Sequence, residues 1–424
     1  VTFSFVIGFL KGFLMLWLIR RIKSIFSPRD VRSEFYAYFY PLVFSGGQLS
    51  MVVTALLAYH YDWKYMYYFM MMLLIVAILL VIILLRHDRP STGVPLRELH
   101  VREMVIISAG LLMLIYVITY GRISDWMAST KICVYIVIAP LLIALFLWEQ
   151  FHSPQPFVSL KPLFQWKAIL GYFYMMLVMF FTTSTTLLSN YMTAILRVDN
   201  VHNYTLYIYL LPGYVLGAFV CFWWFRWQRW RFRFLIAGGM ACFAVFFGML
   251  YFTISPDSTY EMLFLPLFFR GLGMMVLLIA FGLFVVEDLK PKLLISNAFF
   301  LIAFRSVLAP VVASAFYSNM LYRLQQHYIV QLSESMTAVD PLAAARYSSA
   351  LGSNLAGGHG IDEAMSLATN SLYTVVQQQS MLLALKHMLG WLLVVTLVLA
   401  VISRFVPFHK TIRVPVVRMG EDMV

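Results

Sequence analysis

The sequence predicts an all-α protein that crosses a membrane many times, on three observations. Of its 424 residues, 62% are hydrophobic and 12% are charged, whereas about 25% are charged in a typical soluble domain. The apolar residues gather in runs of roughly 20, the length that a spanning helix needs. Lys and Arg gather in short clusters between these runs, as expected at the cytoplasmic ends of spanning helices. The composition excludes a soluble enzyme, a disordered chain and a disulfide-linked secreted domain.

Eleven apolar runs are long enough to cross the membrane. Each is expected to be a helix, because lipid offers the backbone no other hydrogen-bonding partner. In chain order the predicted spans are residues 1–19, 35–58, 64–85, 104–120, 132–149, 168–190, 204–225, 234–254, 260–286, 294–317 and 379–404.

The basic residues orient these spans. Alternate connections, together with the tail 404–424, hold 21 of the 31 Lys and Arg residues, and the other connections hold six. Basic residues favour the cytoplasm, so the tail is expected there and residue 1 outside. The positive charges follow the first run instead of preceding it, unlike those of a signal peptide. We therefore expect an N-terminus truncated by an odd number of helices; the alternative is an intact eleven-helix protein.

Several local patterns follow one another along the chain. They are Gly8-Phe-Leu-Lys-Gly12 ahead of the basic loop at Pro28, Pro156–Phe164 ahead of Trp166, Arg270-Gly-Leu-Gly273, Ser296-Asn297 with Arg305, His327 with Leu332 and Glu334, and Gln377–Gln379 before the last run. In this order and spacing they resemble the fourteen-helix drug:proton antiporter branch of the major facilitator superfamily.

The resemblance covers essentially the whole chain and implies the major facilitator fold. It implies that the chain begins at the fourth of fourteen helices, so that three, an odd number, are missing. It divides the chain into the remainder of an N-terminal helix bundle (1–103), two linker spans (104–167) and a C-terminal six-helix bundle (168–424). The last part is expected to include a long outer loop (318–378) and a cytoplasmic tail (405–424).

The sequence departs from that branch in three places. Ser4 and Ile7 stand where the family's fourth helix carries an Arg and a Gln. The run Ser45–Ala55 lacks the proline of the antiporter motif, and Arg226–Arg233 lacks the acid of a cytoplasmic motif. Drug/proton antiport is therefore implied by the resemblance alone, while the fold is expected to be retained.

Charged side chains inside the spans are the first candidates for binding or gating, because burying them costs roughly 2.5–3.5 kcal/mol. Arg305 matches a cavity or gating arginine of the family, and its guanidinium suits an anionic group or helix carbonyls. Arg270, beside Gly271 and Gly273, is a candidate for the site or for locking a close helix contact. Lys11 lies too deep in the first run to reach water easily, on a helix that lines the cavity in this superfamily.

Uncharged polar residues are a second set of candidates. Thr183 belongs to the hydroxyl cluster 182–186, which Asn190 follows, and such hydroxyls often bond to their own helix. Gln48, Ser45 and Tyr214 are further candidates for the cavity. Every Asp and Glu lies at the end of a run or in a connection, whereas proton coupling needs a titrating group in the membrane. In the family that acid lies on the first helix, so this chain is not expected to transport by itself.

The predicted function is secondary active transport by alternating access, namely proton-coupled export of small amphipathic compounds. One alternative is a divergent carrier of an anionic metabolite or lipid, favoured if Arg305, Arg270 and Lys11 face one cavity. Another is a non-transporting membrane subunit or scaffold. An enzyme is not expected, because the nine histidines are scattered, and no Cys or His spacing indicates a metal.

No cofactor is expected, because the proton gradient supplies the energy. The expected partners are a small-molecule substrate and the lipid bilayer, without nucleic acid; a periplasmic adaptor and an outer-membrane channel are further candidates. The predicted location is the plasma (inner) membrane, with several spans and a cytoplasmic C-terminus.

Overall fold

The computed structural model describes residues 8, 26, 32–84, 100–153, 156–227, 232–286, 289, 293–336 and 340–406. All regular elements in these ranges are helices. Ten stretches in them are long and apolar enough to cross a membrane, which confirms the predicted all-α membrane fold. Lys11 and, apart from Gly8, the rest of the predicted span 1–19 lie outside the described residues.

The described helices follow the predicted spans closely, with three interruptions, one of them a 3₁₀ turn at Leu206–Tyr209 between α8 and α9. Their bounds are α2 Arg32–His60, α3 Trp63–Leu84, α4 Val101–Tyr120, α5 Thr130–His152, α6 Trp166–Thr182, α7 Thr185–Ala194, α8 Asn200–Thr205, α9 Leu210–Arg226, α10 Phe232–Thr253, α11 Phe264–Val286, α12 Leu294–Ile302, α13 Ala309–Ser335, α14 Pro341–Ala356 and α15 Ile361–Phe405. The span predicted at 168–190 is broken between α6 and α7, and a π-helix at Ala303–Leu308 joins α12 to α13.

Helix α11 is the centre of the molecule. It packs against α9, α10, α6 and α2, and almost all of its residues from Arg270 to Val286 are buried. Glycines bring the neighbouring backbones close: a Cβ on Gly271 would lie 2.5 Å from the carbonyl oxygen of Leu210, at the start of α9. A helix that is apolar on all sides is buried in this way. By contrast, α3 is exposed along nearly its whole length, as suits a helix that faces lipid.

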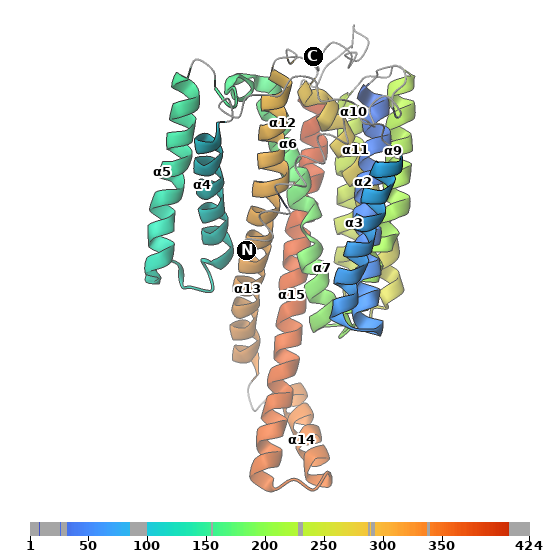
Figure 1. Ribbon diagram of the computed structural model, residues 1–424. Coiled ribbons are helices and arrows are strands. Elements are labelled where there is room, and N and C mark those ends of the chain that lie inside the picture. Colours follow the sequence, from blue (N-terminus) through green and yellow to red (C-terminus); the bar gives the residue numbers. More distant parts are fainter. Residues whose placement is uncertain are drawn as a thin grey trace.

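Figure 1 shows α4 and α5 side by side at one edge of the molecule, with α2, α3 and α9 at the opposite edge. Helices α2 and α3 are the described helices of the predicted N-terminal bundle. Of the two, α2 makes the principal contact with the C-terminal bundle, because it packs on both α9 and α11. The interface between the two predicted bundles therefore runs along α2.

The connection 318–378, which the sequence predicts to be a long outer loop, is largely helical. Helix α13 continues to Ser335, α15 already begins at Ile361, and α14 packs against α15 between them. The start of α14 has a local cause: Asp340 accepts a hydrogen bond from the N–H of Leu342, and Pro341 occupies the first turn, where a missing N–H costs nothing. These three helices project beyond the others in Figure 1.

Candidate functional site

Arg305 joins the C-terminal bundle to α2. Its Nη1 lies 3.3 Å from the hydroxyl oxygen of Tyr40 and donates to it, and its guanidinium carbon lies 5.8 Å from the centre of the Tyr40 ring. Both ends of this contact sit at helix irregularities. Arg305 belongs to the π-helix, a feature that often marks functional sites. Tyr40 precedes Pro41, which lacks the N–H needed for a regular helical hydrogen bond.

Arg270 is buried inside the C-terminal bundle, with 5% of its surface exposed. Its Nη2 donates to the carbonyl oxygen of Thr182 at 2.6 Å. Its Nε and Nη1 have no hydrogen-bond partner among the described residues. Its guanidinium carbon lies 5.9 Å from the centre of the Phe246 ring. Burying a guanidinium with two unpaired nitrogens costs folding free energy. A functional role for Arg270 would explain why this cost is tolerated.

Three tyrosines surround that guanidinium. Tyr207, Tyr214 and Tyr317 lie close enough to Arg270 to interact with it electrostatically, and all three are buried. They come from three segments of the chain, at residues 206–209, α9 and α13. Together with Phe246, they make a largely aromatic environment around one positive charge.

The break between α6 and α7 supplies the carbonyl that Arg270 binds. At this break, the hydroxyls of Thr182 and Thr183 both bond to the carbonyl of Met179, at 2.9 and 2.8 Å. The carbonyls near the break turn to other helices. Arg270 binds that of Thr182, and the Tyr317 hydroxyl binds that of Phe180 at 3.0 Å. Ser184, also at the break, is buried with a hydroxyl that has no partner among the described residues.

Gln48 and Tyr214 extend this cluster to α2. Gln48 lies near Tyr214, whose hydroxyl donates to the sulfur of Met274 at 3.6 Å. The Oε1 of Gln48 is buried without a partner among the described residues. The Phe44 ring, one turn earlier, lies 6.2 Å from that of Tyr214 at a steep angle. Arg270 is thus linked through Tyr214 to the helix that also carries the partner of Arg305.

The other two uncharged candidates lie apart from these contacts. Ser45 is half-buried on α2, and Asn190 is half-buried on α7. No side-chain hydrogen bond connects either of them to another residue in the described ranges.

The two arginines lie at different depths. Arg305 and Tyr317 are twelve residues apart along one helical stretch, which is about 18 Å. Tyr40 and Gln48 are eight residues apart on α2, about 12 Å. Arg305 with Tyr40 therefore forms one layer, and Arg270 with Tyr214 and Gln48 forms another.

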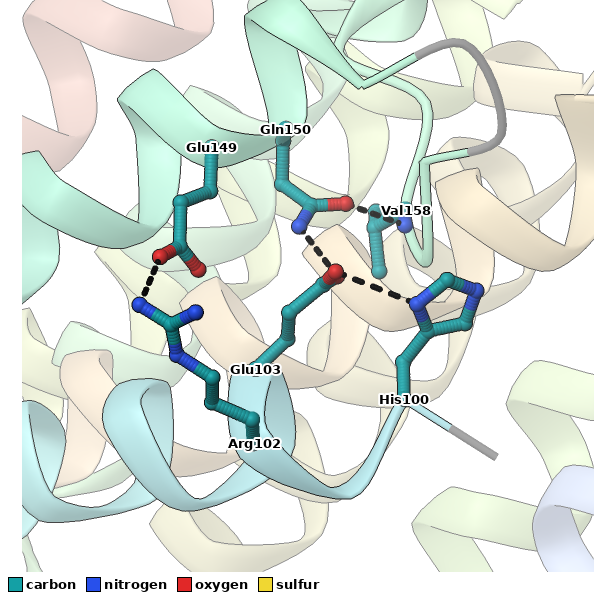
Figure 2. A network of polar contacts seen from close by, with 6 residues as sticks. All are labelled: His100, Arg102, Glu103, Glu149, Gln150 and Val158. Atoms are coloured by element: carbon teal, nitrogen blue, oxygen red, sulfur yellow. Dashed lines mark hydrogen bonds and ion pairs between the residues drawn. The ribbon is translucent and has the colours of Figure 1, made fainter. Parts of the chain in front are cut away.

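A polar network at the ends of α4 and α5 was not foreseen from the sequence (Figure 2). The Gln150 amide donates to Glu103 at 2.5 Å and accepts from the N–H of Val158 at 2.8 Å, while 3% of Gln150 is exposed. His100 Nδ1 lies 3.1 Å from the other oxygen of Glu103. The network ties both linker helices to the segment that leads into α6.

Two residues of a motif quoted above, both buried near the start of α12, bind this segment and the helix that follows it. Ser296 Oγ accepts a hydrogen bond from the N–H of Ser159 at 2.9 Å, which holds the linker segment to the C-terminal bundle. Asn297 accepts one from the Tyr172 hydroxyl of α6 at 2.5 Å, which joins α12 to α6 within that bundle.

Sequence reasoning also missed the aromatic partners Tyr40, Tyr317, Tyr207 and Phe246. The chain has 25 tyrosines and 36 phenylalanines, and composition does not separate these four from the residues that face lipid. These four differ from the other aromatic residues because each lies next to Arg305 or Arg270. Sequence spacing does not reveal which residues lie next to each other across the bundle.

Residues 1–314 match the family described as the Major Facilitator Superfamily. None of the curated proteins matches the chain.

Proposed function

The chain belongs to the major facilitator superfamily and is a multi-pass secondary transporter; within that class we propose that it exports small amphipathic compounds by proton-coupled alternating access. We propose the proton as the coupling ion because the sequence resembles the drug:proton antiporter branch. It places the protein in the plasma (inner) membrane with its C-terminus in the cytoplasm.

The contact between Arg305 and Tyr40 is the observation that carries the proposal. In alternating access, one bundle rocks against the other around a central site. The polar contact at 3.3 Å crosses from α2 to the C-terminal bundle, where such rocking would change distances most. Both groups adjoin irregular backbone, which lines cavities in transporters. We assign Arg305 the role of a gate that closes on Tyr40 in one of the two states.

The aromatic surroundings support an amphipathic substrate. Tyr207, Tyr214, Tyr317 and Phe246 offer flat apolar faces together with hydroxyl groups. Gln48 and Tyr214 lie between α2 and α9, so a compound bound there would touch both bundles. Its contacts would differ between the inward-facing and outward-facing states, as coupling between substrate and conformation requires.

Transport by membrane vesicles tests this proposal. The protein is expressed from the complete reading frame of its gene, because these residues hold no acid inside a span. Inverted vesicles are energised, and uptake of the amphipathic cation ethidium and the amphipathic anion cholate is measured with and without a protonophore. We expect uptake of at least one probe that collapses with the proton gradient. Arg305→Gln should abolish it, and Arg305→Lys should retain part of it. Uptake unaffected by the protonophore, or equal in Arg305→Gln and the unaltered chain, contradicts the proposal.

A second candidate function is transport of an anion, and the unpaired nitrogens of Arg270 favour it. A carboxylate or phosphate would satisfy Nε and Nη1 at once, since guanidinium binds such groups in a bidentate manner. The same assay separates the two candidates. If the substrate is anionic, cholate uptake exceeds ethidium uptake and disappears in Arg270→Gln; if it is not, Arg270→Gln transports both probes at an unchanged ratio.

The proposal also includes a periplasmic adaptor and an outer-membrane channel as partners. The projecting helices α13, α14 and α15 offer the longest surface beyond the other helices (Figure 1). Deletion of α14 should then lower export from whole cells and leave uptake by inverted vesicles unchanged.

A further inference from the structure

An open groove of about 630 Å³ lies between α10, α13 and α15, outside the cluster described above. Its lining combines a cation with aromatic and aliphatic side chains: Tyr251, Tyr328, Leu383, Lys386, His387, Gly390, Trp391, Leu393 and Val394. Gly390 allows close packing on one side, because a Cβ there would lie 3.4 Å from the Tyr251 ring. None of these residues takes part in the contacts of Arg270 or Arg305.

The polar groups of the groove leave donors available. The Tyr328 hydroxyl lies 2.7 Å from Nδ1 of His387, and Nε2 of that ring has no hydrogen-bond partner among the described residues. The His387 ring stacks on Trp391 at an angle of 15°. Lys386 has no ion-pair partner among the described residues. An ammonium and a ring nitrogen therefore stand at one opening without an acid opposite them.

Two measurements place the groove at a membrane surface. Lys386 precedes Arg404 by 18 residues on α15, about 27 Å along the helix, against a hydrocarbon core of about 30 Å. Arg122, just past the end of α4, donates to the carbonyl of Ser318 and lies 5.1 Å from the Tyr322 ring, so these two residues of α13 lie at the level where α4 ends.

Tyr328 follows Tyr322 by six residues, about 9 Å. Side chains of a helix lean toward its N-terminus, so Tyr328 points back toward the membrane and meets His387 there. Tyr and Trp are the residues enriched at this depth. The contact between Tyr328 and His387 thus lies in the headgroup layer.

We infer that this groove binds the phosphate of a membrane phospholipid. The Lys386 ammonium pairs with the phosphate, and Nε2 of His387 donates a second hydrogen bond. One acyl chain then runs toward the membrane centre along Leu393 and Val394. Charge complementarity selects a phospholipid over a neutral lipid, because an unpaired ammonium at the end of a span gains most from an anionic headgroup. The inference concerns a site away from the transport pathway and does not depend on the proposed substrate.

Lipid retention by the purified full chain tests the inference. The protein in detergent is titrated with dioleoyl phosphatidylglycerol, with dioleoylglycerol, which has the same chains and no phosphate, and with inorganic phosphate, and bound molecules are counted by native mass spectrometry. We expect one phosphatidylglycerol to be retained more strongly than dioleoylglycerol. Lys386→Gln should weaken it roughly fivefold, and Lys386→Arg should restore it.

A matched control is available on α3. Lys64 is exposed and lies beside a tryptophan, with its Nζ 6.0 Å from the centre of the Trp63 ring, but it does not line the groove. Lys64→Gln should leave the strongest phosphatidylglycerol bound. Equal retention in Lys386→Gln and the unaltered chain overturns the inference, as does equal retention of dioleoylglycerol. Displacement of the lipid by millimolar inorganic phosphate would overturn it in favour of an ion site. Equal melting temperatures of the variants confirm that the comparison is between folded proteins.

Discussion

Among single residues, Arg270 has more hydrogen-bond donors than the residues around it satisfy. One of its nitrogens binds the Thr182 carbonyl, and two have no partner among the described residues. Replacing a buried charge by an apolar side chain of similar size is often neutral or stabilising. An apolar side chain would hold the helices together at a lower cost in folding free energy. We therefore interpret Arg270 as retained to bind a ligand, at the expense of stability.

Arg270→Met is therefore expected to change stability by less than about 1 kcal/mol, or to raise it, while transport of the anionic probe is lost. Tyr317→Phe is the comparison, because it deletes a satisfied bond to the Phe180 carbonyl and should cost about 0.5–1.5 kcal/mol. Thermal unfolding of the detergent-purified proteins measures both. A drop of several kcal/mol in Arg270→Met would show that the arginine is a structural lock.

At the scale of elements, the contact between α9 and α11 depends on backbone proximity. Gly271 faces the carbonyl of Leu210, and a Cβ on Gly213 of α9 would overlap the carbonyl oxygen of Phe268. Small residues at such places let helices in lipid approach closely and gain van der Waals contact. The same approach brings Tyr214 to Arg270, so packing and site geometry are coupled here.

Gly271→Ala should therefore destabilise the protein by about 1–3 kcal/mol, because the helices have to separate to admit a methyl group. Gly238→Ala on α10 is the matched control: a Cβ there meets nothing within 4 Å, and alanine favours a helix by up to about 1 kcal/mol. Melting temperatures compare the two. Equal destabilisation by both substitutions would contradict the close contact.

The polar network that holds the linker helices is buried at Gln150 and exposed at Arg102. Gln150 is buried between Glu103 and the N–H of Val158, whereas the side chain of Arg102, paired with Glu149 at 2.8 Å, is 78% exposed. Buried hydrogen bonds that lose a partner leave costly unpaired groups, and exposed ion pairs contribute about 0–1 kcal/mol.

Gln150→Leu should accordingly speed hydrogen exchange at the Val158 amide by roughly five- to a hundredfold, since about 1–3 kcal/mol of protection is lost. Arg102→Gln should change that exchange less than about fivefold. Mass spectrometry of the peptide that contains Val158 reads out both variants (Figure 2). Similar effects of the two substitutions would show that the network acts as a surface cluster.

At the scale of the whole molecule, the charge distribution predicts which ends of the helices face the cytoplasm. Alternate connections and the tail 404–424 together carry 21 of the 31 basic residues. On this basis α14 lies outside the cell and the end of α5 inside it. The projecting helices in Figure 1 would then extend away from the cytoplasm.

Cysteine labelling checks this orientation. Ser349→Cys, exposed on α14, should react with a membrane-impermeant maleimide in cells whose plasma membrane is intact and accessible. Ser153→Cys, just after α5, should react only once that membrane is permeabilised. The opposite pattern would reverse the predicted topology. The chain without either substitution controls for its three cysteines, Cys133, Cys221 and Cys242.

The amino-acid sequence was enough to identify the class of the protein and to locate each described span. A spanning helix is recognised by the length and apolarity of one local segment, and lipid forces that segment to be helical. The span that carries Arg305 and the span that carries Arg270 were therefore found without knowing their neighbours. The projecting connection 318–378 is predicted as a loop and is largely helical instead, because a polar helix lacks the apolar signal.

The contacts of Arg270 and Arg305 are known only from the tertiary structure. Arg270 binds a carbonyl 88 residues away in sequence, and Arg305 binds a hydroxyl 265 residues away. Such pairings follow from which helices pack together and at what height, and apolar side chains in lipid leave that choice to shape and small residues. The break after Thr182 and the groove at Lys386 are also not predictable from the sequence, because each is defined by residues from separate helices.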